Sequence, residues 1–290
     1  FPLLEPGPCP TKANATTHLR HQEHGGMGPM EHDTSGLDSE RGRIDERDPV
    51  LEEQLSDASQ VLHVLPIFCA LPIFWCLYDQ QGSVWTLQAN RMALHGLQPE
   101  QLNVVNPIEI MLFLPLFEKL IYPFLEREQW DISPLTRMQW GMLLSAISFV
   151  MSGLVESWIE YNNDHGVDKV SVFWQLPQIT ILAVGEIFVS VTGLEFAYAC
   201  APTRVKALIM SLFLLTTAVG NMFSGALYST VFAHMDRSTI MHVCALLMMC
   251  NLTVFYFLAK WWKQTDAMDL RRSLFPQSTN EIEMETTRRD

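Results

Sequence analysis

Residues 170–200 read VSVFWQLPQITILAVGEIFVSVTGLEFAYAC, a stretch dominated by apolar side chains in which Glu186 and Glu195 are the charged residues. A helix of this length, at about 1.5 Å per residue, crosses the hydrocarbon core of a bilayer. Backbone polar groups in lipid must pair within the segment, and membrane strands would be about ten residues of alternating polarity. The stretch therefore predicts a membrane-spanning helix and an all-α membrane protein.

Other long apolar stretches fill the centre of this 290-residue chain, although its mean hydropathy is only +0.11. We predict six transmembrane helices within residues 61–262, near 62–89, 103–125, 137–157, 171–200, 205–232 and 239–262. Small residues recur where such helices approach closely. They are Gly141, Ser145, Ser148, Gly185, Ser190, Gly193, Gly220, Ser224 and Gly225.

The two ends of the chain are polar. Residues 1–60 hold 12 acidic against 5 basic side chains, and residues 263–290 are again rich in charge. Such segments cannot bury enough apolar surface to offset the entropy of ordering, so we predict a disordered cytoplasmic linker and a disordered cytoplasmic tail. His18, His21 and His24 recur every third residue, but we interpret them as part of a polar tail and expect no metal site.

Charge excludes some functions and indicates an orientation. The net charge of −13 and the lack of a basic stripe argue against nucleic-acid binding, and no enzyme motif is present, so we predict a non-enzyme. One set of predicted connections carries seven Lys and Arg near the span ends and the alternate set carries Arg91, Lys169 and Arg237. Positive residues remain on the cytoplasmic side, so we expect both termini there.

Glu186 is the most informative residue, because it lies near the middle of its predicted span. A carboxylate at that depth costs at least about 2.5 kcal/mol. No basic residue is found at comparable depth in the other five predicted spans, so we predict a ligand or proton role for Glu186. Glu195 lies nearer the cytoplasmic end, within reach of solvent or Arg204, and we interpret it as structural.

Further polar residues interrupt the apolar stretches. Asp79, Gln80 and Gln81 directly follow FWCLY, so at least one side of that helix is wet. Phe74 and Trp75 lie one turn earlier. They either form an aromatic wall beside these polar residues or pack against neighbouring helices. Asn106 and Asn221 supply two amides, which either bind a ligand or join helices.

Several longer motifs carry a resemblance to a known family. They are FWCLYDQQGSVWTLQA, NP opening a helix that continues to PLFEKLIYPFL, WQLPQ followed by GE and GLEFAYACAP, and LLTTAVGN. With these motifs, residues 65–262 resemble the second half of the proton-coupled oligopeptide transporters of the major facilitator superfamily, particularly the animal-type members. The resemblance implies a six-helix half of a major facilitator bundle.

The resemblance also implies roles for individual residues. Glu186 matches the acidic residue that receives the amino terminus of the peptide, with Asn106 nearby and Asn221 close to the same end. Phe74, Trp75 and Gln81 match pocket-lining positions, and Asp79 matches a gating carboxylate. Phe213 stands in the pocket position where family members usually have Trp, so a ring remains without the indole donor.

The family's ExxER motif and its lysine, which belong to the first half, are not found here. We therefore expect a missing N-terminal six-helix half and interpret the chain, which begins with Phe1, as a fragment. The large lumenal domain of intestinal-type members is also absent, since the corresponding loop has about 15 residues.

The expected function is proton-coupled symport of di- and tripeptides across a lipid bilayer, in the plasma membrane rather than a lysosomal-type organelle. Protons are the coupling ion, and no cofactor is expected. Two alternatives stay open: a transporter of a non-peptide solute such as nitrate, and a half-length membrane partner that does not transport.

Overall fold

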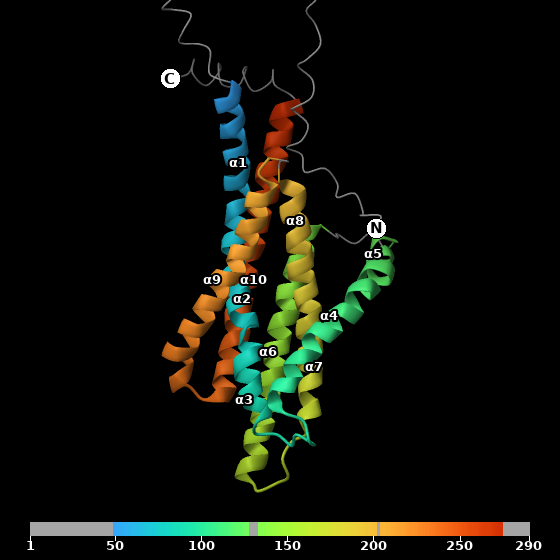
Figure 1. The fold of residues 1–290 in the computed structure, drawn as a ribbon, viewed down its shortest axis with the longest axis vertical. Coiled ribbons are helices and arrows are strands. Elements are labelled where there is room, and N and C mark those ends of the chain that lie inside the picture. The colour runs from blue at the N-terminus through green and yellow to red at the C-terminus, as the bar shows by residue number, and fades with distance from the viewer. Residues whose placement is uncertain (1–48, 128–132, 202–203, 275–290) are drawn as a thin grey trace, which may run out of the picture. The chain divides into compact units, whose positions relative to one another are not determined.

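A computed structural model describes residues 49–127, 133–201 and 204–274, and it shows helices joined by short connections (Figure 1). In this described part, Ala93 and Ser171 form one isolated bridge, and no strand is present. The all-α prediction is therefore confirmed. Residues 64–261 form one compact unit; in the other unit, the rings of His63 and Trp262 lie 5.5 Å apart.

The first predicted span is a helix with one break and one widened turn. It consists of α1 (Pro49–Cys69), α2 (Leu71–Tyr78), a π-helical turn (Gln81–Trp85) and α3 (Thr86–Ala89). Pro72 stands at the start of α2. Proline lacks an N–H group and is favoured in the first turn of a helix, so it accounts for the break at Ala70.

The second predicted span, 103–125, is helical but less regular than expected. A 3₁₀ turn (Pro99–Val104) leads into α4 (Val105–Leu116), a π-helical turn (Phe117–Ile121) and α5 (Tyr122–Arg127). Within the described residues, five helices rather than six are long and apolar enough to cross a membrane, and this segment is not one of them. Its charged residues Glu109, Glu118 and Lys119, together with Pro115 inside α4, explain the difference.

The remaining four predicted spans appear as long helices. They are α6 (Pro134–Asp164), α7 (Leu176–Glu186) continued by a π-helical turn (Ile187–Val191) and α8 (Thr192–Cys200), α9 (Lys206–Thr230), and α10 (Arg237–Leu274). A 3₁₀ turn (Val172–Gln175) precedes α7, and another (Phe232–His234) follows α9. These four segments and the span Asp57–Ala89 are the five candidates for crossing a membrane.

Helices continue beyond several of the predicted spans. α1 begins at Pro49 and α10 ends at Leu274, so helix is present at 49–60 and 263–274, where we predicted disordered segments. Residues 1–48, with the three histidines, and 275–290 lie outside the described residues. α6 likewise continues to Asp164, beyond the predicted span 137–157.

Small residues bring the helices of the central unit into close contact, as predicted. A methyl group on Gly141 of α6 would lie 2.6 Å from the carbonyl oxygen of Gly185 in α7. One on Gly220 of α9 would lie 2.5 Å from Cβ of Trp75 in α2. Gly225 is an exception, with nothing within 4 Å. These contacts fix α7 against α6 and α9 against α2, which run side by side in Figure 1.

Candidate functional site

Glu186 lies at the meeting point of three helices. The hydroxyl of Tyr78, from α2, donates a short hydrogen bond to its Oε2 atom. The side-chain amide of Asn106, from α4, donates to the same oxygen at 3.0 Å and to the Tyr78 hydroxyl at 2.7 Å. Asn106 is only 4% exposed. The three side chains form a closed triangle, which we call the Glu186 triad.

The partners of Glu186 are neutral. Two ion pairs in the described part of the chain are those of Arg91 with Glu156 and of Arg137 with Glu195, and neither includes Glu186. The Glu186 carboxyl has further lone pairs besides those that accept from Tyr78 and Asn106. The site can therefore accept a cationic group from outside the chain.

Widened helical turns adjoin two members of the triad. Glu186 is the last residue of α7, and a π-helical turn begins at Ile187. Tyr78 is the last residue of α2, and a π-helical turn begins three residues later at Gln81. Such turns are rare and are frequently found at functional sites.

An aromatic wall adjoins the triad through Tyr78. The Trp75 ring lies edge-on to the rings of Phe74 and Tyr78, at centroid distances of 5.2 and 5.7 Å. Among the described residues, the indole Nε1 of Trp75 and the Oδ1 atom of Asn106 are buried and have no hydrogen-bond partner. The acceptor lies next to Glu186 and the donor belongs to a ring that contacts Tyr78, so the two could pair with an N–H group and a carbonyl of a ligand.

Two other predicted residues lie close to the triad along the chain. Asp79 is exposed and accepts a hydrogen bond from Ser224 of α9, whose Oγ lies 2.7 Å from its Oδ2. Gln81 lines a cavity of about 10 Å³, roughly the size of one water molecule, together with Trp85, Thr86, Pro99, Leu102, Asn103, Gln175 and Ile179. Gln81 is thus placed to contact a ligand or a water molecule in this cavity, whose lining does not include Tyr78, Asn106 or Glu186.

The structure does not bring Phe213 or Asn221 to Glu186. The Phe213 ring packs edge-on against Phe68 at 5.8 Å and against Gly193, and it is 4% exposed, so it belongs to the helix packing. Asn221 is exposed on α9, next to Gly220, which packs on Trp75.

Several polar contacts were not foreseen from the sequence. Tyr78 was overlooked, although its position four residues after Phe74 places both on one face of the helix. Thr180 of α7 donates to Glu109 of α4 at 2.7 Å. Glu195 pairs with Arg137 at 3.7 Å. In the described residues, no group of three or more metal-ligating side chains is found.

The fold and the site define a multi-pass membrane protein with a partly buried carboxylate that, among the described residues, is held by neutral side chains. A family model described as POT family matches residues 39–243. The chain belongs to the POT family, a family of transporters with the major-facilitator type of fold.

Individual relatives agree with this membership. Peptide transporter PTR2 of Saccharomyces cerevisiae is 33% identical over 187 residues, which cover 62% of this chain and 31% of the relative. Solute carrier family 15 member 2 of Rattus norvegicus is 36% identical over 143 residues, or 48% of this chain and 19% of the relative. A crystal structure of an auto-inhibited POT family peptide transporter is 31% identical, with a TM-score of 0.62, over 71% of this chain and 42% of that one. The chain thus spans less than half the length of each.

Proposed function

We propose that this chain forms the C-terminal half of a proton-coupled symporter for di- and tripeptides, and that Glu186 binds the amino terminus of the peptide. The observation that carries the proposal is the Glu186 triad, a carboxylate held by neutral Tyr78 and Asn106. The names of the relatives, which are peptide transporters, support this choice of substrate.

The chemistry of the triad favours a positively charged, reversible ligand. Inside a membrane protein the local dielectric constant is low, so an ammonium group and a carboxylate attract each other more strongly than in water. Asn106 Oδ1, Trp75 Nε1 and Gln81 offer polar groups for the peptide backbone. Recognition of backbone groups would admit many side chains.

The complete transporter would bind its substrate near the membrane midplane, between this half and an N-terminal six-helix half. Protons would drive uptake through groups of that other half. The excess of Lys and Arg on one set of connections supports cytoplasmic termini. We propose the plasma membrane as its location.

Replacing Glu186 by Gln in the full-length protein tests the proposal. Gln keeps the shape of the side chain and removes its charge, so acid-stimulated uptake of a labelled dipeptide should be lost while the amount at the cell surface is unchanged. Glu195→Gln is the matched control, because Glu195 is a carboxylate on the following helix, α8, and is 57% exposed. Undiminished uptake by Glu186→Gln would refute the assignment.

A competition assay separates peptides from other solutes. An anion such as nitrate is repelled by Glu186, so unlabelled dipeptides should compete with the labelled one and nitrate should not. Competition by nitrate alone would indicate a transporter of another solute.

A further inference from the structure

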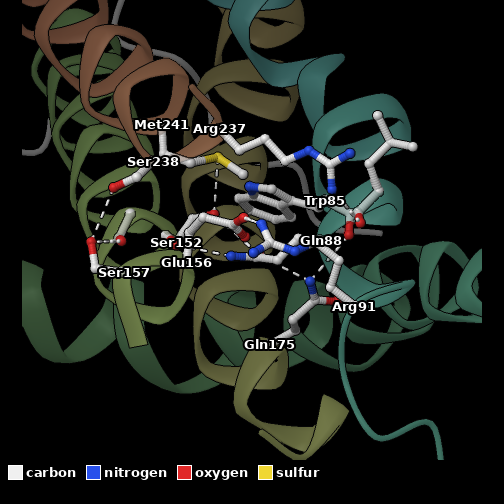
Figure 2. Close-up of polar contacts among 12 residues, drawn as sticks. Trp85, Gln88, Arg91, Ser152, Glu156, Ser157, Gln175, Arg237, Ser238 and Met241 are labelled. Atoms are coloured by element: carbon white, nitrogen blue, oxygen red, sulfur yellow. Dashed lines mark hydrogen bonds and ion pairs between the residues drawn. The ribbon is translucent and has the colours of Figure 1, made fainter. Parts of the chain in front are cut away.

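A cluster of buried side-chain amides joins three helical segments at one end of the central unit (Figure 2). The Oε1 atom of Gln88, in α3, accepts hydrogen bonds from Gln175 at 2.9 Å and from Gln178 at 3.1 Å. Its Nε2 atom donates to the backbone oxygen of Ser152, in α6, at 3.0 Å. We call these four residues the Gln88 cluster.

The members of this cluster are almost completely buried. Gln88, Gln178 and Ser152 are 0% exposed and Gln175 is 1% exposed. A buried amide costs free energy unless it is hydrogen-bonded, so these side chains stabilise the fold only in the arrangement where they pair. Gln88 belongs to the end of the motif FWCLYDQQGSVWTLQA, and Gln175 and Gln178 belong to WQLPQ. None of these three glutamines is part of the Glu186 triad.

The cluster and the triad join the same two helices. Tyr78 and Gln88 lie ten residues apart on the helix formed by α2, the π-helical turn and α3. Glu186 lies eight residues after Gln178 on α7, which runs in the opposite direction in Figure 1. At about 1.5 Å per residue, both separations are on the order of 12–15 Å. The pair Gln88–Gln178 and the pair Tyr78–Glu186 are therefore compatible with one antiparallel alignment of the two helices.

The Gln88 cluster also contacts the π-helical turn Gln81–Trp85, which lies between Tyr78 and Gln88 along the helix. The amide of Gln175 donates to the backbone oxygen of Trp85, the last residue of the π-helical turn, at 3.1 Å. Gln175 and Gln81 line the same water-sized cavity. Any change in the winding of this turn would rotate Tyr78 relative to Gln88.

We propose that Gln88 is a positioning residue for peptide binding: through Gln175 and Gln178 it fixes the register that holds Tyr78 against Glu186. This proposal rests on the proposed function. Loss of the Gln88 hydrogen bonds would let the helix of Tyr78 shift along α7, and the carboxylate would lose its alignment for an ammonium group. Contacts that the rest of the peptide makes away from Glu186 would be unaffected.

The substitution Gln88→Met in the full-length protein removes these hydrogen bonds and keeps the length of the side chain. The ion pair of Arg91 with Glu156 still joins this end to α6, so the variant should fold. The matched control is Gln80→Met. Gln80 is also 0% exposed, but it donates to Ser224 of α9 at 2.8 Å rather than to α7.

The measurement is competition of labelled dipeptide uptake by a free dipeptide and by its N-acetylated form, which lacks the ammonium group. Gln88→Met should weaken inhibition by the free dipeptide about three- to tenfold, the size expected of one misaligned hydrogen bond, and should leave the N-acetylated form unchanged. Gln80→Met should not change the ratio of the two inhibition constants.

Binding of the two peptides to purified protein extends the test to variants that do not transport. Glu186→Gln alone should abolish the preference for the free dipeptide, and adding Gln88→Met should then change nothing. A Gln88→Met variant that weakens both peptides equally, or neither, overturns the positioning role. Unchanged preference in Glu186→Gln would instead overturn the proposed function. Should Gln88→Met fail to reach the membrane, Gln175→Met carries the same comparison.

Discussion

Glu186 and Glu156 are two carboxylates inside transmembrane helices, and they differ in their burial and in their partners. Glu156 is 0% exposed and forms an ion pair with Arg91 (Figure 2). Glu186 is held only by the neutral side chains of Tyr78 and Asn106, within the residues that the structure describes. The first charge is compensated by the protein itself. Under the proposed function, the ammonium group of a bound peptide would compensate the second.

The comparison shows that burial alone does not identify a binding residue. Both carboxylates cost free energy to bury, but a carboxylate that has its own cation is already compensated and contributes to packing. The absence of a cationic partner is what distinguishes Glu186. Four substitutions can break or sharpen this distinction.

The largest effect is expected for Arg91→Ala, which leaves Glu156 buried without its cation. Breaking such a pair destabilises a protein by about 3–5 kcal/mol, whereas replacing both partners by apolar residues costs far less. Thermal unfolding of the purified full-length protein should show a much lower unfolding temperature for Arg91→Ala. The double variant Arg91→Met, Glu156→Leu should recover most of that decrease. Equal losses in the two variants would contradict the comparison.

The next effect concerns Tyr78→Phe, which removes one of the two donors that support the charge of Glu186. Hydrogen bonds to charged groups contribute about 1.5–3 kcal/mol, so binding of a free dipeptide should weaken at least about tenfold. Binding of the N-acetylated dipeptide should be unchanged. Tighter binding of the free dipeptide would show that the hydroxyl competes with the ligand rather than supporting the carboxylate.

A smaller effect is expected for Gly141→Ala. Gly141 of α6 packs against Gly185 of α7, the residue directly before Glu186. Its methyl group would meet the Gly185 carbonyl oxygen at 2.6 Å, so the helices must separate, at a cost of about 1–3 kcal/mol. Gly225→Ala is the control: it meets nothing within 4 Å and should stabilise the helix by up to about 1 kcal/mol. Unfolding temperatures in detergent check both, and equal shifts would argue against a tight contact.

The smallest effect is expected for Glu195→Gln. Its ion pair with Arg137 is 3.7 Å long and Glu195 is 57% exposed, and exposed pairs contribute less than about 1 kcal/mol. Both unfolding temperature and dipeptide uptake should stay near those of the unmodified protein. A loss of uptake would place Glu195 in the transport mechanism and weaken the distinction drawn here.

The fold class follows from the sequence because apolar stretches of bilayer length leave few alternatives to helices. Glu186 was selected by its depth alone, and Asn106 by its amide and by the family resemblance. Tyr78 was overlooked because an aromatic residue among Phe74 and Trp75 looks like packing until its hydroxyl is placed. The pairing of Arg91 with Glu156 was hidden for another reason: it joins residues 65 positions apart in the chain.

Helix irregularities were the least predictable part. Pro72 and Pro115 hint at the break before α2 and at the disturbed helix after α4. The π-helical turns at Gln81–Trp85 and Ile187–Val191 contain no proline, and they depend on contacts between helices that no local pattern records.

The widened turn at Gln81–Trp85 has a consequence for movement within the membrane. A π-helical turn accommodates one residue more than an α-helical turn, and each residue of an α-helix advances the chain by about 100°. Rewinding this turn would swing Tyr78 about a quarter of a revolution with the rest of the helix intact. The Tyr78 hydroxyl would then leave Glu186 and face a different neighbouring helix.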